Sequence, residues 1–312
     1  MINLEELSVF HDFGKNDVYE RLIAKSPDGK KYFIKKTNKS ILDNQIKSNY
    51  FENELNVIQQ ISHDKIINFV AHKQILNDIY LVFDVANGGS LSDYFKFYLD
   101  KYKKPFPEEF VQNIIKNVSE AIKYLHDSHV IYRNLTLDNT YIDFENEEDL
   151  ADFDLLKANF KIGNFHFSKI LGDNELTHSF IGVPIYMDPN ILFHSKQNDK
   201  IAYEYKADIW SLGAICFELL TGEAPFDGEN YDELIKNVKN GTYKISKDLN
   251  LSKEAVSFIN GMLQYDPKNR FNIDDVIKHD FLNKNVSEFS HKDYETLGKV
   301  DENGIVLDIK IN

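Results

Sequence analysis

Strand-like and helix-like patterns are sorted along this chain, and they do not alternate. Short segments rich in β-branched and aromatic residues fill most of residues 1–84, and helical periodicity dominates after them. Strands followed by helices are typical of an α+β fold, in which a sheet and a helical unit pack separately. We therefore expect a small strand-rich lobe at 1–84 and a larger helical lobe at 85–284.

The first lobe is expected to hold strands and one helix. Strand-like segments lie within 1–36, at 66–71 and at 79–84, and a Pro-Asp-Gly turn predicts a hairpin over 24–35. Residues 49–62 carry apolar side chains at helical spacing, which predicts a helix between the strands.

The second lobe begins after an Asn-Gly-Gly loop. Apolar residues recur at i, i+3 and i+4 over 107–127, which predicts a strongly amphipathic helix. Residues 207–221 are apolar nearly all round, so this helix should be buried, with Gly222 as its C-terminal cap. Further helices are predicted at 230–240, 252–264 and 273–280.

Composition excludes several classes of partner and location. The net charge of −14 argues against nucleic acid and anionic membrane surfaces as partners. No apolar stretch reaches about 18 residues, and the first residues lack a signal-peptide pattern. The single cysteine, Cys216, permits no internal disulfide, which fits a reducing compartment. We therefore expect a cytoplasmic protein.

Short motifs follow one another along the chain in a fixed order. They are Tyr32-Phe33-Ile34-Lys35, His63-Asp64-Lys65-Ile66, Leu81 to Ala86, Tyr132 to Asn139, Asn164-Phe165-His166, Gly182 to Asn190, Asp208 to Gly213, and Asp266-Pro267 with Arg270. In this order, the span from about residue 8 to residue 284 resembles a eukaryotic protein kinase domain. Within that family the chain is most similar to serine/threonine kinases of the ULK type or the calcium-dependent type.

The resemblance implies a bilobal kinase-like fold with a nucleotide site between the lobes. By resemblance, Lys35 is the phosphate-binding lysine and Glu54 is its ion-pair partner. Phe83 stands at the gatekeeper position and Ala86 in the hinge. The residues expected to stack through both lobes as a regulatory spine are Phe69, Ile58, Phe165, Tyr132 and Asp208.

Two carboxylates of the family pattern are missing. Asn134 stands where the family has the aspartate that accepts the substrate hydroxyl proton, and an amide has no basic lone pair. Asn164 stands where the family has the metal-binding aspartate, and a neutral amide is a poor ligand for Mg²⁺. Asn139, a further metal-binding position, is retained, but its alternative role is hydrogen bonding within the loop. We expect no metal.

The nucleotide slot also departs from the pattern. The segment 11–18 has one glycine where the family has three, which hinders close approach of the backbone to phosphate. Phe33 replaces the small residue above the adenine, and Tyr141 occupies the position below it. The two rings could pack on each other and fill the slot, or either ring could turn into the core.

Further losses cluster in the second lobe. Thr136 and Val183 replace a lysine and a threonine that the family links to the catalytic aspartate by hydrogen bonds. Asn190 replaces a glutamate that would pair with Arg270, so Arg270 needs another acceptor. Such coordinated losses indicate relaxed constraint on catalysis.

Two segments lie outside the motifs. The segment 143–154 holds seven carboxylates in twelve residues, and is expected to be a solvated loop or, alternatively, a docking site for a basic partner. The extension 285–312 contains an Asn-Gly turn between short apolar runs, which predicts a β-hairpin at 299–307.

Together these features predict a catalytically inactive kinase-like protein that acts as a scaffold or allosteric binding module. Its partners would be proteins, such as an active kinase or a cytoskeletal or signalling complex. The alternative is an ATP-binding serine/threonine kinase with weak residual phosphotransfer. No cofactor is expected, and ATP without Mg²⁺ is the alternative ligand. The remnant nucleotide site comprises Phe33, Lys35, Glu54, Ala86, Asn139, Tyr141 and Asn164.

Overall fold

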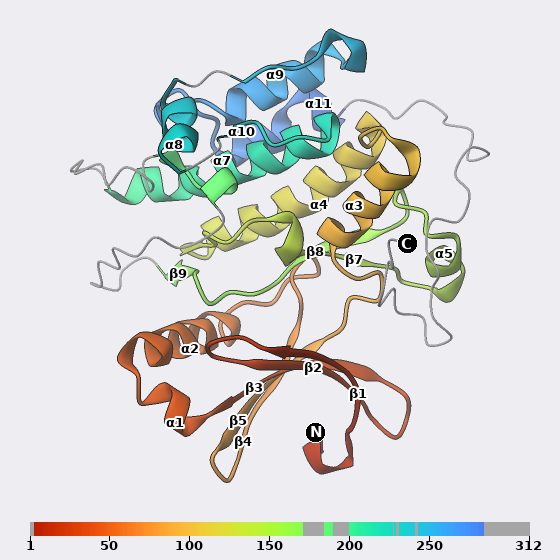
Figure 1. Ribbon diagram of the computed structural model, residues 1–312, viewed down its shortest axis with the longest axis vertical. Coiled ribbons are helices and arrows are strands. Elements are labelled where there is room, and N and C mark those ends of the chain that lie inside the picture. The colour runs from red at the N-terminus through yellow and green to blue at the C-terminus, as the bar shows by residue number, and fades with distance from the viewer. Residues whose placement is uncertain are drawn as a thin grey trace.

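The computed structural model describes residues 3–170, 184–189, 200–226, 228, 231–240 and 243–283. Strands gather in one lobe, at the bottom of Figure 1, and helices form the other lobe, at the top. The prediction of an α+β fold is confirmed. The predicted hairpin at 299–307 lies outside the described residues.

Within the described residues, five strands form an antiparallel sheet in the order β1-β2-β3-β5-β4. The β2–β3 hairpin closes through the predicted Pro-Asp-Gly turn, and Lys25 pairs with Lys31 at its end. The strands are β1 (Ser8–Lys15), β2 (Glu20–Lys25), β3 (Lys31–Asn38), β4 (Phe69–Ile75) and β5 (Asp78–Asp84).

The two faces of this sheet have different surroundings. On one face Leu22, Ala24, Ile34 and Val82 form a small apolar cluster with residues near the N-terminus. The other face looks toward the second lobe, and α2 (Gln45–Ile58) lies beside the sheet after the short α1 (Lys39–Leu42). Side chains of β2 and β3 that alternate with this cluster therefore point toward the space between the lobes.

The amphipathic helix α4 (Glu108–Asp127) lies at the centre of the second lobe, as its predicted apolar stripe requires. It contacts α7 (Lys200–Thr221), whose described side chains from Ala207 to Leu220 are almost all buried. Further helices of this lobe in the described part include α3 (Leu91–Tyr102), α8 (Tyr231–Asn240), α9 (Lys253–Met262), α10 (Ile273–Lys278) and α11 (Asp280–Asn283). None of the helices in the described part is long and apolar enough to cross a membrane.

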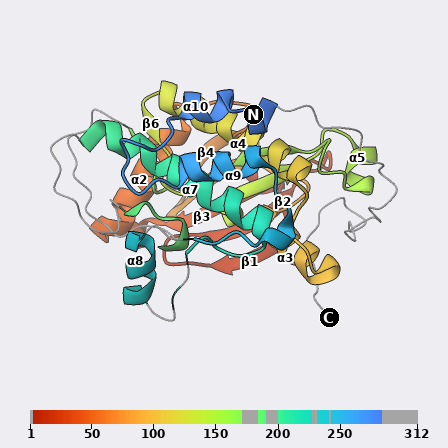
Figure 2. The same ribbon diagram turned by 90° about the horizontal axis from the view of Figure 1, so that it is seen from above.

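Short strands line the side of the second lobe that faces the sheet. Strand β7 (Thr140–Asp143) pairs with β8 (Asn159–Ile162), and β6 (Val130–Ile131) pairs with β9 (Lys169–Ile170). Between β7 and β8 the chain forms the short helix α5 (Glu147–Asp152). In the two perpendicular views, α5 and α8 lie at opposite sides of the molecule (Figures 1 and 2).

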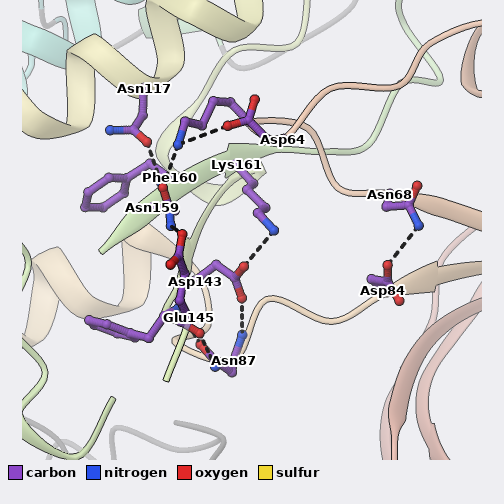
Figure 3. A network of polar contacts seen from close by, with 12 residues as sticks. Asp64, Asn68, Asp84, Asn87, Asn117, Asp143, Glu145, Asn159, Phe160 and Lys161 are labelled. Carbon is purple, nitrogen blue, oxygen red and sulfur yellow. Dashed lines mark hydrogen bonds and ion pairs between the residues drawn. The ribbon is translucent and has the colours of Figure 1, made fainter. Parts of the chain in front are cut away.

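The connection between the lobes is fixed by polar contacts to the β7–β8 hairpin (Figure 3). The side chain of Asn87 donates to the carbonyl of Phe144 at 2.9 Å, and its oxygen accepts from the Phe144 N–H at 2.8 Å. Asp143 accepts from the Asn87 N–H and pairs with Lys161 at 2.6 Å. These contacts set the position of the sheet over β7.

Candidate functional site

A buried ion pair lies on the sheet face that looks into the cleft between the lobes. The Nζ of Lys35 on β3 lies 2.5 Å from Oε1 of Glu54 on α2, and the two residues are 5% and 1% exposed. Burial alone would raise the pKa of the Glu54 carboxyl, but the Lys35 ammonium, with a contribution from His166, holds it below its usual value. Lys35 and Glu54 are therefore brought together as the sequence predicted.

A chain of hydrogen bonds between amides continues from this ion pair. Lys35 Nζ donates to Oδ1 of Asn164 at 2.8 Å, and Nδ2 of Asn164 donates to Oδ1 of Asn139 at 3.0 Å. Nδ2 of Asn139 then donates to the backbone carbonyl of Asn134 at 2.9 Å. An ammonium can only donate and a carbonyl can only accept, so both ends fix the orientation of the amides between them.

The same residues occupy the positions at which the resemblance would place metal ligands. The oxygen of Asn139 already accepts from Asn164, and the oxygen of Asn164 accepts from Lys35 and lies 2.7 Å from the His166 ring. Mg²⁺ prefers charged oxygen ligands, and this set offers only neutral amides. Among the described residues, no group of three or more His, Cys, Asp or Glu side chains is placed to hold a metal ion. The donor set does not fit Mg²⁺.

The base position is buried and acts as a hydrogen-bond donor. Asn134 is 6% exposed, and its Nδ2 donates to the backbone carbonyl of Asn164 at 2.8 Å. Thr136, two residues on, caps the following 3₁₀ turn, because its hydroxyl accepts from the Asn139 N–H. Both side chains therefore hold the loop together.

Asp208 on α7 anchors the start of this loop. Its carboxylate is fully buried and accepts from the backbone N–H groups of Tyr132 at 2.9 Å and Arg133 at 2.7 Å. Nε2 of His126 lies 2.9 Å from the same carboxylate. Arg133 has a φ of 58°, a left-handed conformation that is unfavourable for a long side chain and is held here by these contacts.

The turn between β1 and β2 satisfies its own backbone. Oδ1 of Asn16 accepts from the N–H groups of Val18 at 2.9 Å and Tyr19 at 2.7 Å, and the Gly14 N–H donates to Asp12 at 2.7 Å. A phosphate-binding loop needs such N–H groups to be free for the ligand. Side chains of the protein occupy the acceptor positions that a phosphate would need.

Tyr19, which directly precedes β2, lies over Lys35. Its ring lies 5.1 Å from the Lys35 ammonium, and the ring of Phe83 lies 5.8 Å from it. Tyr19 is itself 4% exposed. The lysine that the sequence identifies as phosphate-binding is thus enclosed by two rings, a carboxylate and an amide.

The rings in the slot do not pair as expected. Phe33 has ring contacts with Phe13 at 6.2 Å and Phe83 at 6.4 Å between centroids, and no ring contact between Phe33 and Tyr141 is found in the described part of the chain. Burial raises the pKa of the Tyr141 hydroxyl to about 12, while the nearby charge of Arg21 acts in the opposite direction. The expected packing of Phe33 on Tyr141 is replaced by an aromatic group within the sheet, and Arg21 lies near Tyr141 instead.

Ile58, Tyr132 and Phe165 of the expected apolar stack are buried in one hydrophobic cluster, and Phe69 packs against that cluster. The rings of Tyr132 and Phe165 lie 5.1 Å apart, and Phe69 lies 5.6 Å from Phe83. The Tyr132 hydroxyl donates to the backbone carbonyl of Gly163. The apolar positions of the family pattern are therefore retained, whereas two of its carboxylate positions hold Asn134 and Asn164.

Residues 17–282 match the protein kinase domain family. The chain belongs to the protein kinase domain family. This span covers the first lobe from β2 onward and the second lobe as far as Leu282, whereas Asp12, Gly14 and Asn16 of the β1–β2 turn lie before it.

Serine/threonine kinases are among the relatives of this kinase domain. It is 27% identical to serine/threonine-protein kinase ATG1a of Arabidopsis thaliana, over 84% of this chain and 40% of that protein. It is 25% identical to serine/threonine-protein kinase PLK4 of Aedes aegypti over 97% of this chain and 37% of that protein. It is 28% identical to myosin light chain kinase A of Dictyostelium discoideum, over 82% of this chain and 81% of that protein. The chain thus spans less than half of the first two proteins.

The buried Arg270 of the second lobe forms an ion pair with a residue other than the one at the position the resemblance implies. Arg270 is 2% exposed, and its guanidinium forms an ion pair with Asp188, which is also buried. It also donates to the carbonyls of Gln264 at 2.9 Å and Lys206 at 2.7 Å. The expected loss of this pair is therefore compensated from the same segment, two residues before Asn190. Val183 and Asn190 lie outside the described residues.

The acidic segment is anchored more firmly than a solvated loop. Leu150 and Phe153 are buried, and the ring of Phe153 stacks on Tyr94 with 4.6 Å between centroids. Asp149 pairs with Lys157 at 2.8 Å. Glu145, Glu147, Glu148 and Asp152 are exposed, as expected for a solvated segment, but part of the segment forms helix α5 and its apolar residues Leu150 and Phe153 are buried.

Sequence reasoning placed most of the cleft residues and missed several. Lys35, Glu54, Asn139 and Asn164 converge, and Ala86 lies buried in the connection after β5. The roles of Asn16, Tyr19, Arg21 and Asp188 were not predicted. Alternation along β2 was the one available signal, because it places residues 19, 21 and 23 on the same face as Lys35.

Proposed function

We propose that this kinase domain is catalytically inactive and acts by binding a protein partner. The observation that carries the proposal is the chain of hydrogen bonds from Lys35 through Asn164 and Asn139 to the carbonyl of Asn134. Metal-dependent phosphotransfer would need these side chains to bind metal and phosphate, but here they are engaged in hydrogen bonds to one another.

The base position supports the same conclusion. A general base must accept a proton, whereas the Asn134 amide is neutral and donates to a backbone carbonyl. Loss of a general base typically lowers a rate by about 10²–10⁴-fold. Closure of the β1–β2 turn by Asn16, and enclosure of Lys35 by Tyr19, add to this loss.

A binding role is supported by what remains intact. The core of both lobes is well packed, and α2 is held to the second lobe through Asn53, which donates to the carbonyls of His166 and Ser168. The partner would be a protein, such as an active kinase or a cytoskeletal or signalling complex, in the cytoplasm. The net charge of −14 disfavours nucleic acid and anionic membranes.

The test is phosphotransfer from radiolabelled ATP with Mg²⁺ or Mn²⁺. We expect incorporation into the protein itself and into a generic basic substrate to equal that of a Lys35→Ala control. The double variant Asn134→Asp with Asn164→Asp should stay inactive, because the β1–β2 turn and Tyr19 are unchanged. Turnover by the wild type that Lys35→Ala abolishes would refute the proposal.

The second candidate is a serine/threonine kinase with weak residual phosphotransfer. The Lys35–Glu54 ion pair favours it, since an active protein kinase needs this pair, and the contact of Tyr132 with Phe165 is compatible with it. The same assay separates the candidates, because only residual activity would be lost in Lys35→Ala.

A further inference from the structure

The side chain of Arg21 lies on the cleft face of the sheet. In the β2–β3 pair Arg21 is directly opposite Lys35, and Ile23 is opposite Phe33. Opposite residues in an antiparallel pair share a face, so Arg21 and Lys35 point to the same side. The charge of Arg21 also acts on Tyr141 on β7, across the cleft from the sheet.

The two cations are not neutralised equally. Lys35 pairs with Glu54 at 2.5 Å. For Arg21, the described residues provide neither an ion pair nor an acceptor for its Nε, and that nitrogen is buried. Glu20, its neighbour in sequence, pairs with Lys15 and Lys36 instead.

Within the described ranges, the charge of Arg21 has no ion-pair partner because the nearby side chains of the cleft floor are neutral amides. Asn134, Asn139 and Asn164 are neutral amides that bond one another. Asp138, which also acts on Tyr141, is exposed and forms no ion pair among the described residues. Among the described residues, the buried carboxylate of Glu54 pairs with Lys35, and no carboxylate forms an ion pair with Arg21.

An arginine keeps its charge under all ordinary conditions, so it cannot escape this environment by losing a proton. A buried donor without an acceptor is costly, and two like charges directly opposite in a sheet repel each other. An anion at this point would remove both penalties. The planar fork of donors in a guanidinium matches a tetrahedral oxyanion with two parallel hydrogen bonds.

We propose that the cleft binds a phosphate-type oxyanion through the guanidinium of Arg21, without a metal ion. The ligand is inorganic phosphate or the phosphate group of a nucleotide, since both present the same oxygens. Lys35 is not required, because Glu54, Asn164 and Tyr19 already occupy its surroundings. The proposal is independent of catalytic inactivity, because it concerns binding in the absence of metal.

The test measures thermal unfolding and calorimetric binding of the full chain in buffer containing EDTA. Inorganic phosphate, AMP and ATP are titrated separately against chloride of equal ionic strength. Wild type should be stabilised by phosphate, and Arg21→Gln should bind it about 10- to 100-fold more weakly, because a charged hydrogen-bonding group is lost. Nucleotides that bind no tighter than phosphate would identify the free anion as the ligand, and tighter nucleotide binding would identify the nucleotide.

Two further variants keep the test decisive. Lys25→Gln removes the same charge from the same strand at its turn end, and should retain the response to phosphate. Arg21→Lys keeps the charge but not the two-pronged donor, and should bind with intermediate affinity. In chloride alone Arg21→Gln should unfold no earlier than wild type, since an unpaired charge has been removed. An unchanged phosphate response in Arg21→Gln, no response in wild type, or a response that requires Mg²⁺ would overturn the proposal.

Discussion

Replacing Asp208 by alanine removes the acceptor that holds the backbone of Tyr132 and Arg133. Its carboxylate is fully buried and receives both N–H groups, at 2.9 Å and 2.7 Å. Water cannot take its place in the packed surroundings of α7. Arg133 would keep its left-handed conformation without the contacts that stabilise it.

The expected loss follows from these contacts. A buried donor left without an acceptor costs about 1–3 kcal/mol, so two such donors cost roughly 2–6 kcal/mol. For a domain of this size, each kcal/mol lowers the melting temperature by about 2–4 °C, which gives a fall of roughly 5–20 °C. The His126 contact adds to this loss without changing its order.

The assay is thermal unfolding followed by circular dichroism, with amide hydrogen exchange as a local readout. The amides of Tyr132 and Arg133 should exchange faster in Asp208→Ala. Asp64→Ala is the control, because its side chain is 72% exposed and its pairing with Lys65 should contribute no more than about 1 kcal/mol. If the melting temperature of Asp208→Ala equals that of Asp64→Ala, Asp208 does not anchor the loop.

Three further predictions concern stability. Burial, with the charge of Lys35, lowers the pKa of His166 from 6.5 to about 4, so the unfolded chain takes up a proton first as the pH falls. The free energy of unfolding, measured by urea titration, should therefore drop by about 3 kcal/mol between pH 6.5 and 4. This drop should be absent from His166→Gln. If the free energy of unfolding of wild type and variant falls equally with pH, the assignment to His166 is contradicted. Gly213→Ala should cost about 1–3 kcal/mol, because a Cβ there would lie 2.8 Å from Met262 Cβ where α7 meets α9, and an unchanged melting temperature would exclude this close packing. Asp188→Asn should cost about 3–5 kcal/mol by leaving Arg270 buried and unpaired, and a loss below about 1 kcal/mol would show that the pair does not hold the fold.

Local patterns were enough to predict most elements of the fold. Helix α4 was predicted at 107–127 and runs from Glu108 to Asp127, because its apolar stripe is regular along its whole length. The helix predicted at 49–62 begins earlier, since the side chain of Asn44 accepts from the N–H groups of Ile46 and Lys47 and so fixes its start. Helix α3 was missed, although Ser90 caps it in the same way.

The candidate site depended on information that local patterns do not contain. Motif order was enough to place Lys35 near Glu54 and Asn164. The position of Arg21 required the register of β2 against β3, because a shift of one residue would move it to the opposite face. The partner of Arg270 could not be read from spacing either, since Asp188 lies 82 residues away in sequence.

The hydrogen-bonded amides in the cleft bear on how such a sequence can change over evolutionary time. Asn164→Asp alone would set a carboxylate against the oxygen of Asn139, two acceptors with no proton between them. Asn134→Asp alone would likewise set a carboxylate oxygen against the carbonyl of Asn164. Each single substitution would therefore lower the stability of the fold. Selection for a folded protein would therefore oppose each of these two substitutions.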